Sequence, residues 1–424
     1  MCITDGSRSG GENAGVSASD QRTVDSGLAR FERPFPAARP DAARRTLLEL
    51  PDEPPVDIAE GPPARCHLRL SEGNTGLATL LTGLALLARR GRAQLSWEWV
   101  PSPRPLESGP WHLRDKAGTS AELIVDGRHS VYLDIHDSFE LDAKALASHD
   151  VYFKRSLRLD VPIAPSRASM RAMGLVNHVH PDGFDGEEAR RLLSRPEPLQ
   201  ARVAALLRAV TAMTAAALGA GGRPTLSLIS GPPSRTRDPR VLFMAGLWDP
   251  ALVPDAAPDK IAEFEAVNEM RAECVRVLRR EFGPRFHGGV QHSEFARRNF
   301  PDVLLERGAD GGKRAFLQLV RDNAICVTTT GLHGSNGWKL VEYVGLSRAI
   351  VSEPLRYVVP GDFAAGRHYL DFGSPEVCAE QVARLMQDHD EREAMMEANQ
   401  RYAREWMHPE RLAWRVIRAA REKR

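Results

Sequence analysis

The sequence predicts an α/β protein with two Rossmann-like lobes, and three observations support this fold class. The chain has 424 residues, which exceeds one ordinary hydrophobic core and fits two domains of about 150 to 200 residues. Short apolar runs follow a helical segment through residues 77–154, and this alternation is typical of a Rossmann-like lobe. A strand, a glycine-rich loop, a helix and a second strand are expected in succession through residues 322–355.

Three segments are expected along the chain. Residues 1–64 are rich in Gly, Pro, Ser and charged residues, which predicts a disordered or loosely packed arm. A first lobe is expected over residues 65–225 and a second over residues 226–424, the latter ending in C-terminal helices. The boundary follows a long Ala-rich helical stretch at 198–218, because the glycines and the proline of residues 219–224 stop a helix.

Apolar periodicity and turn signals set the expected element boundaries. The first lobe is expected to contain a helix over 77–89 and strands over 93–100, 121–125, 130–135 and 151–154. The second lobe is expected to contain strands over 241–245, 325–329 and 349–352, and helices over 260–282, from near Gly337 and from Pro375 onward.

Composition argues against nucleic acid as a partner and against export or insertion into a membrane. The 57 basic residues almost balance the 56 acidic residues, so no broad attraction to nucleic acid is expected. The N-terminus lacks the regions of a signal peptide, and the most apolar helical stretch, 203–218, is interrupted by Arg208, so we expect a cytoplasmic protein without a membrane span. Reduced thiols are expected at the five widely spaced cysteines, Cys2, Cys66, Cys274, Cys326 and Cys378.

The helix expected after Gly337 carries two charged residues, Lys339 and Glu342, that are three positions apart and so share a face. The carboxylate can accept hydrogen bonds from the hydroxyls of a ribose, and the ammonium can meet a phosphate. A surface ion pair between the two residues is the alternative interpretation.

The loop before that helix runs through His333, Gly334, Ser335, Asn336 and Gly337. Its closely spaced backbone N–H groups and its glycines are suited to a pyrophosphate, and His333 is a possible donor to a phosphate or sugar oxygen. An ordinary turn before a helix has the same glycines, so the functional interpretation rests on the position of the loop after a strand.

Charged residues also gather at the ends of two strands of the first lobe. Asp134, His136 and Asp137 follow one strand and are candidates for a general base that takes a proton from an acceptor hydroxyl. Lys154 and Arg155 end the next strand, in a segment that looks like one seen in some group 1 sugar transferases. That resemblance makes them candidate contacts of the donor phosphate or of the acceptor. For Lys154 and Arg155, a charged strand end that faces water is the alternative.

The segment around Glu342 resembles the donor half of GT-B glycosyltransferases of the group 1 type, in which a Lys-Leu-x-Glu-Tyr-like run follows a glycine-rich loop. The resemblance implies two lobes in a GT-B arrangement with an interlobe cleft, and it assigns the ribose grip to Glu342. Two positions depart from the pattern, since Gly334 replaces a second glutamate and Leu247 replaces the arginine of a pyrophosphate clamp, a role for which Arg271 is a candidate. The resemblance continues through Pro360, Gly361, Gly366, Tyr369, Leu370, Phe372, Asn399, Tyr402 and Pro409.

This resemblance implies a glycosyltransferase that moves a sugar from a nucleotide-sugar donor in the second lobe to an acceptor in the first. No cofactor or metal ion is expected. A nucleotide-sugar epimerase of the same fold and a sugar-nucleotide-binding scaffold without turnover are the alternatives. Residues 311–314, Gly-Gly-Lys-Arg, lack the first glycine and the Ser/Thr of a phosphate loop, and no Gly-x-Ser-x-Gly elbow occurs, so kinase, P-loop and serine hydrolase functions lack support.

Overall fold

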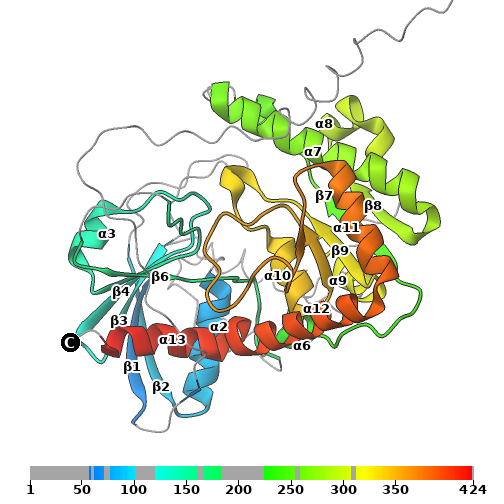
Figure 1. Cartoon of the computed structure of the whole chain (residues 1–424). Helices are drawn as coiled ribbons and strands as arrows, with labels where there is room; N and C mark the ends of the chain where they lie inside the picture. Colours follow the sequence, from blue (N-terminus) through cyan, green and yellow to red (C-terminus); the bar gives the residue numbers. More distant parts are fainter. Residues whose placement is uncertain are drawn as a thin grey trace, which may run out of the picture.

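Two α/β lobes, each built around its own sheet, form the protein (Figure 1). The computed structural model describes residues 57–58, 62–70, 77–100, 120–160, 166–182, 224–253, 258–306 and 312–422. The helix predicted over 198–218 and nearly all of the N-terminal arm lie outside these residues. Within the described ranges, no helix is long and apolar enough to cross a membrane.

A six-stranded mixed sheet forms the first lobe, with the strand order β2-β1-β3-β4-β5-β6. The elements of this lobe are β1 (Ala64–Leu70), α2 (Ala78–Arg89), β2 (Ala93–Trp99), β3 (Ser120–Val125), β4 (His129–Asp134), α3 (Ala143–Ser148), β5 (Val151–Lys154) and β6 (Ser169–Ala172). Each first-lobe strand and helix that was predicted within the described residues is present, with ends within one residue of the prediction.

The first sheet is not fully parallel, because β3 runs antiparallel to both β1 and β4. β3 and β4 form a hairpin whose turn contains Asp126 at φ 56° and Gly127 at φ 73°. Positive φ at both central residues is the geometry of a type I′ turn, which suits the twist of the flanking strands. β4, β5 and β6 then run parallel, so the loops after β4 and β5 leave the same edge of the sheet.

The second lobe has a five-stranded parallel sheet with the order β11-β10-β9-β7-β8. Its strands are β7 (Val241–Ala245), β8 (Phe286–Val290), β9 (Ile325–Thr328), β10 (Ala349–Ser352) and β11 (Leu370–Asp371). Its α-helices are α6 (Leu226–Ile229), α7 (Pro258–Phe282), α8 (Glu294–Asn299), α9 (Gly312–Asp322), α10 (Trp338–Gly345), α11 (Pro375–Gln387) and α12 (His389–Tyr402). Short 3₁₀ helices separate several of these: η2 (Pro250–Leu252), η3 (Gly283–Arg285), η4 (Pro301–Val303) and η5 (Leu332–Gly334). A π-helical turn, η6 (Ala403–Met407), follows α12.

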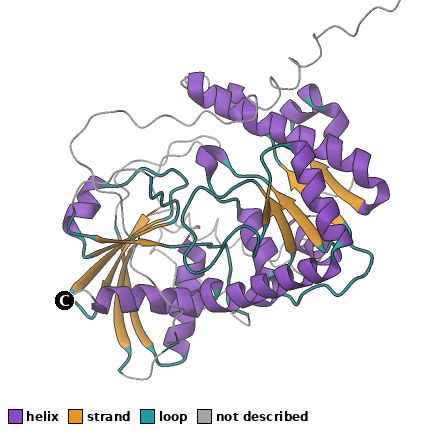
Figure 2. Cartoon of the chain, viewed as in Figure 1, coloured by secondary structure: helices purple, strands orange, loops and turns teal. Residues whose placement is uncertain are grey.

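Helices cover both faces of this second sheet, as Figure 2 shows. Successive side chains of a strand point to opposite faces, and in β7 Phe243 joins the core that contains α7, α8 and α11, whereas Met244 joins the core that contains α9 and α10. Two Rossmann-like lobes in a GT-B arrangement, as predicted from the sequence, are therefore confirmed.

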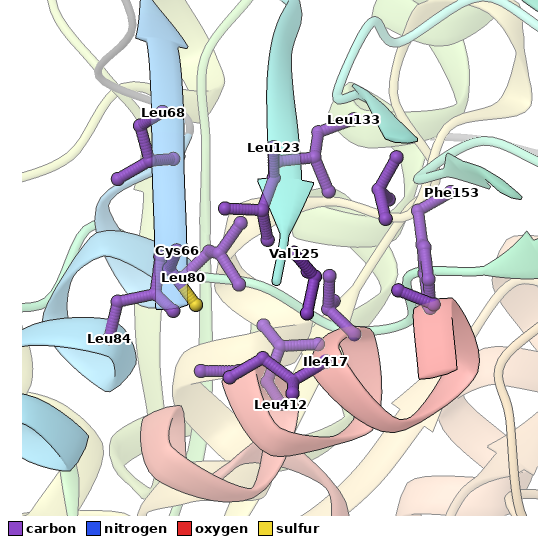
Figure 3. Packing of buried hydrophobic residues seen from close by; sticks show 14 of the residues in the cluster. Cys66, Leu68, Leu80, Leu84, Leu123, Val125, Leu133, Phe153, Leu412 and Ile417 are labelled. Atoms are coloured by element: carbon purple, nitrogen blue, oxygen red, sulfur yellow. The ribbon is translucent and has the colours of Figure 1, made fainter. Parts of the chain in front are cut away.

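The last helix, α13 (Pro409–Glu422), returns to the first lobe. Figure 3 shows Leu412 and Ile417 of α13 pointing into the same core as Cys66 and Val125 of the first sheet. Arg415 is buried as well and donates to the main-chain carbonyl of Met173, 2.5 Å away, in the loop after β6. This helix was predicted as part of the second lobe, but its apolar face completes the core of the first.

Gly83 allows α13 to pack closely against α2. A Cβ atom at Gly83 would lie 1.9 Å from the carbonyl oxygen of Pro409 and 2.9 Å from the Cβ of Ala413. We expect Gly83→Ala to lower the free energy of unfolding by about 1 to 3 kcal/mol, because the helices must separate to admit the methyl group. Urea unfolding would measure the change, with Gly373→Ala as the control, since a Cβ at Gly373 would meet no atom within 4 Å. An unchanged midpoint for Gly83→Ala would contradict the close packing.

Candidate functional site

The C-terminal edge of the second sheet contains a topological switch point between β7 and β9. The chain leaving β7 leads to α7 on one face of the sheet, and the chain leaving β9 leads to α10 on the other. Because the two connections diverge, a crevice for ligands is expected at this position in an open α/β sheet. Most of the second-lobe candidates predicted from the sequence lie here.

Arg271 of α7 ties together the two chain segments that diverge at the switch point. Its Nε donates to Thr329 Oγ1 at 2.9 Å, its Nη1 to the Gly246 carbonyl at 2.6 Å and its Nη2 to the Thr330 carbonyl at 3.3 Å. Gly246 follows β7, whereas Thr329 and Thr330 follow β9. Arg271, which was predicted to contact a phosphate, thus donates three hydrogen bonds within the protein. Its position lets it shape the crevice.

The loop between β9 and α10 has a fixed conformation centred on His333, which adopts the left-handed φ of 60°. Its N–H donates to the carboxylate of Glu263, and its carbonyl accepts a hydrogen bond of 2.6 Å from the Tyr357 hydroxyl. Lys260 Nζ lies 3.2 Å from His333 Nε2. Burial, and then the Lys260 ammonium, lower the pKa of His333. The imidazole is therefore neutral at pH 7 and offers hydrogen bonding instead of positive charge.

The rest of this loop departs from the predicted phosphate cradle. The Gly334 N–H donates to the Gly331 carbonyl at 3.1 Å, and the Ser335 N–H donates to the carbonyl three residues before it, also at 3.1 Å. These amides close a tight turn, so they do not point at a ligand. Asn336 behaves differently: its side-chain Oδ1 is buried without a hydrogen-bond partner among the described residues. Gly337 then caps α10.

Glu342 lies in the second turn of α10 and is only 1% exposed. Its Oε1 accepts a hydrogen bond from Lys313 Nζ of α9, and its Oε2 is buried without a hydrogen-bond partner in the described part of the chain. Burial raises the pKa of Glu342, although Lys313 opposes that effect. A buried acceptor that lacks a donor is costly in a folded protein, and it is a reason to look for a ligand.

Lys339 lies one turn before Glu342 and points toward β7, where its Nζ donates to the Met244 carbonyl. Burial lowers the pKa of Lys339 to about 7, and the nearby Arg271 guanidinium acts in the same direction. Lys339 and Glu342 thus lie on one helix, as predicted, but the Glu342 carboxylate accepts its hydrogen bond from Lys313. Lys313 was not predicted as a site residue, because residues 311–314 resemble only an incomplete phosphate loop.

Asp134 and Lys154 of the first lobe form a buried ion pair, with Asp134 Oδ1 3.0 Å from Lys154 Nζ. The same carboxylate accepts hydrogen bonds from the Tyr152 hydroxyl at 2.5 Å and from the His136 N–H at 2.9 Å. Lys154 is fully buried, and Asp134 is 7% exposed. Three donors therefore already occupy the Asp134 carboxylate within the protein, and its catalytic role stays a prediction.

Asp137 and Arg155 lie where the two lobes meet. Arg155 pairs with the Asp137 carboxylate through Nη1, and its Nη2 donates to the Asn336 carbonyl of the second lobe at 3.1 Å. The guanidinium also lies 4.2 Å from the ring centroid of Trp338, the first residue of α10. The His178 ring lies 4.4 Å from the same indole ring. The first lobe therefore holds the start of the helix that carries Lys339 and Glu342.

The predicted catalytic residues differ in how accessible they are to an acceptor. Asp137 keeps about half of its side chain exposed, and His136 is partly buried, with its Nδ1 2.8 Å from Ser138 Oγ. These two are the accessible groups among the predicted catalytic residues. The structure brings together at the lobe junction and the switch point Asp137, Arg155, Arg271, His333, Asn336, Lys339 and Glu342.

Comparison with known proteins gives likenesses of structure alone. No family model and no curated protein matches the sequence. Solved structures of GT-B glycosyltransferases of the group 1 type do match the fold. The C-terminal domain of the group 1 glycosyl transferase LpcC from Francisella tularensis is 11% identical, with a TM-score of 0.28 over 42% of this chain and 95% of that domain.

Two further matches were solved with ligands. Anabaena HepE in complex with UDP and glucose is 10% identical, with a TM-score of 0.33 over 66% of this chain and 65% of HepE. The pneumococcal O-GlcNAc transferase GtfA in complex with UDP and GlcNAc is 15% identical, with a TM-score of 0.29 over 45% of this chain and 37% of GtfA. The chain therefore spans less than two thirds of either protein. Because each TM-score is below 0.5, these likenesses do not assign an activity, which has to be argued from the residues.

Proposed function

We propose that this chain binds a nucleotide sugar at the switch point of the second sheet and transfers the sugar to an acceptor beside the first lobe. The observation that carries the proposal is the Glu342 carboxylate, which is 1% exposed and has an oxygen without a hydrogen-bond donor among the described residues. A ribose offers two adjacent hydroxyl donors, which suit a carboxylate. The same edge of the sheet carries Lys313 and Lys339, whose charges suit a diphosphate.

The proposed chemistry depends on the charge that develops on the leaving diphosphate. When the bond between the sugar carbon and the phosphate oxygen breaks, its electron pair stays on that oxygen. Cations beside that oxygen stabilise the charge, and Lys339 and Lys313 would have this role once the ligand is bound. That no metal ion takes part stays a prediction.

The acceptor would lose a proton as its oxygen bonds to the sugar carbon. Asp137 is our choice for the group that takes this proton, because its carboxylate is about half exposed and lies at the lobe junction. Arg155 would position that carboxylate through their ion pair. His136 is the second choice, and Asp134 is not one, since its oxygens are occupied by internal donors.

A binding experiment tests the donor site. Isothermal titration with UDP, GDP, dTDP, ADP and CMP would compare the wild type with Glu342→Gln and with Glu380→Gln, a control on an exposed position of α11. We expect one nucleotide to bind the wild type and the control equally. Glu342→Gln should weaken that binding about tenfold, because an amide replaces a charged acceptor of two ribose hydroxyls.

Two results would contradict the proposal at different steps. No binding of any nucleotide at millimolar concentration would remove the donor site. Binding of a nucleotide sugar without release of the nucleoside diphosphate, tested with a range of acceptors, would remove the transfer step and leave a binding scaffold. Conversion of the bound sugar to its epimer would instead identify an epimerase.

A further inference from the structure

We propose that Lys313 binds the diphosphate of the nucleotide, and that its ion pair with Glu342 is a resting contact that the ligand replaces. This inference rests on the proposed function and names the residue that supplies the phosphate charge. When the nucleotide is bound, the ribose hydroxyls would donate hydrogen bonds to the Glu342 carboxylate, and the Lys313 ammonium would move to the phosphates. No bond other than hydrogen bonds and ion pairs changes in this exchange.

The first argument is that Arg271 and Lys339, the other cations at the switch point, do not supply the full positive charge that a diphosphate requires. Arg271 donates to Thr329, Gly246 and Thr330, and so holds the ends of β7 and β9 together. Lys339 donates to a carbonyl of β7, and burial lowers its pKa to about 7, so its ammonium is only partly charged at that pH. A diphosphate carries at least two negative charges, which calls for a further cation.

The second argument is the difference in mobility within the ion pair. The Lys313 side chain is 38% exposed, whereas that of Glu342 is 1% exposed and fixed inside the lobe. Lysine has a flexible four-carbon stem, so Lys313 is the partner that can move. Its departure would free Glu342 Oε1 to accept a ribose hydroxyl beside Oε2, which already lacks a donor within the described residues.

The third argument is the position of Lys313 in its helix. Lys313 is the second residue of α9, an 11-residue helix whose first turn contains no acidic residue. The amides at the start of a helix lack intrahelical acceptors and, with the helix dipole, favour an anion. Lys313 Nζ and Lys339 Nζ lie 5.5 and 5.9 Å from the Phe316 ring centroid, so both ammonium groups flank one side chain. A diphosphate bound beside this ring would have both ammonium groups nearby.

Titration of each nucleoside and its 5′-diphosphate separates a phosphate contact from a structural role. The pairs would be uridine and UDP, guanosine and GDP, thymidine and dTDP, and adenosine and ADP. Lys313→Met should weaken diphosphate binding about tenfold or more, since it removes a charge-assisted hydrogen bond. Nucleoside binding should be unchanged or tighter, because Lys313 no longer competes for Glu342.

Arg314→Met is the matched control, because it removes the same charge from the next, exposed position of α9. It should change diphosphate affinity less than about twofold, as expected for an exposed charge without direct contact. Lys313→Met leaves a buried carboxylate without its cation, so the double variant Lys313→Met/Glu342→Gln would be compared with Glu342→Gln alone. The double variant should bind the diphosphate more weakly than Glu342→Gln alone.

The outcomes separate this inference from the proposed function. If the wild type binds a nucleoside diphosphate and Lys313→Met binds it equally well, the inference is wrong and the donor site stands. If Lys313→Met lost affinity equally for the nucleoside and for the diphosphate, the inference would also be wrong. That result would show that Lys313 only keeps Glu342 in position. If the wild type binds no nucleotide, the proposed function fails, and this inference fails with it.

Discussion

Asp134→Ala is expected to lower the free energy of unfolding by about 3 to 5 kcal/mol, because it removes the anion that neutralises a buried cation. Lys154 is fully buried, and Asp134 Oδ1 lies 3.0 Å from its Nζ. The Tyr152 hydroxyl would lose its acceptor in the same variant. Urea unfolding followed by circular dichroism would measure the loss.

Two further variants test whether charge pairing causes this effect. Asp134→Leu/Lys154→Met replaces the buried pair by apolar groups and should recover most of the stability, since such replacements are often neutral. Asp160→Ala removes a partner of Arg158. The Asp160 side chain is 65% exposed, so this variant should lower the free energy of unfolding by no more than about 1 kcal/mol. Wild-type stability of Asp134→Ala combined with lost sugar transfer would restore Asp134 as a catalytic residue and contradict our placement.

The elements that the sequence predicted best are those with a strong local signal. β9 and β10 are continuous apolar runs, as expected for strands buried on both faces of a parallel sheet. The glycine-rich loop between them marked the start of α10 to within one residue. Apolar runs and a glycine-rich loop were together sufficient to locate this unit.

β8 was missed because glycine is usually depleted from strands. Its sequence, Phe-His-Gly-Gly-Val, carries two glycines, and a Cβ at Gly288 would lie 1.9 Å from the Phe243 carbonyl of β7. Glycine at this position follows from close approach of two backbones, which the local pattern does not reveal. The hairpin of β3 and β4 was also missed, although Asp126-Gly127 is a strong hairpin signal.

The candidate site was predictable only as far as single helices and strand ends allow. Lys339 and Glu342 were placed on one helix correctly, but Lys313, the partner of Glu342, comes from 29 residues earlier in the chain. Arg155 meets the Asn336 carbonyl across 181 residues. Such partners depend on how elements pack, because sequence periodicity reports the buried face of each element and not its neighbour.

Nucleotide affinity is expected to fall by roughly 10- to 50-fold between pH 7 and pH 9, provided that the diphosphate binds beside Lys339 as proposed. Burial lowers the pKa of Lys339 to about 7, so the group loses its proton over this range in the ligand-free protein. A bound diphosphate favours the ammonium form and raises that pKa. Binding above pH 7 therefore requires proton uptake, and each further rise in pH weakens it.

Titration calorimetry in two buffers with different heats of ionisation would measure the uptake directly. About one proton should be taken up per diphosphate at pH 8, because Lys339 is then mostly neutral before binding. Lys339→Met should bind more weakly at pH 7 and show no uptake. Lys144→Met, at an exposed position of α3, should behave as the wild type.

Glu342 has to be separated from Lys339 in this experiment, because burial raises the pKa of that carboxyl group. Glu342→Gln removes its titration, and the pH dependence should persist in that variant if Lys339 is the source. His333 does not interfere, since burial lowers its pKa and keeps the imidazole neutral above pH 7. An affinity that stays constant from pH 7 to pH 9 in the wild type, without proton uptake, would show that the ammonium of Lys339 does not meet the diphosphate.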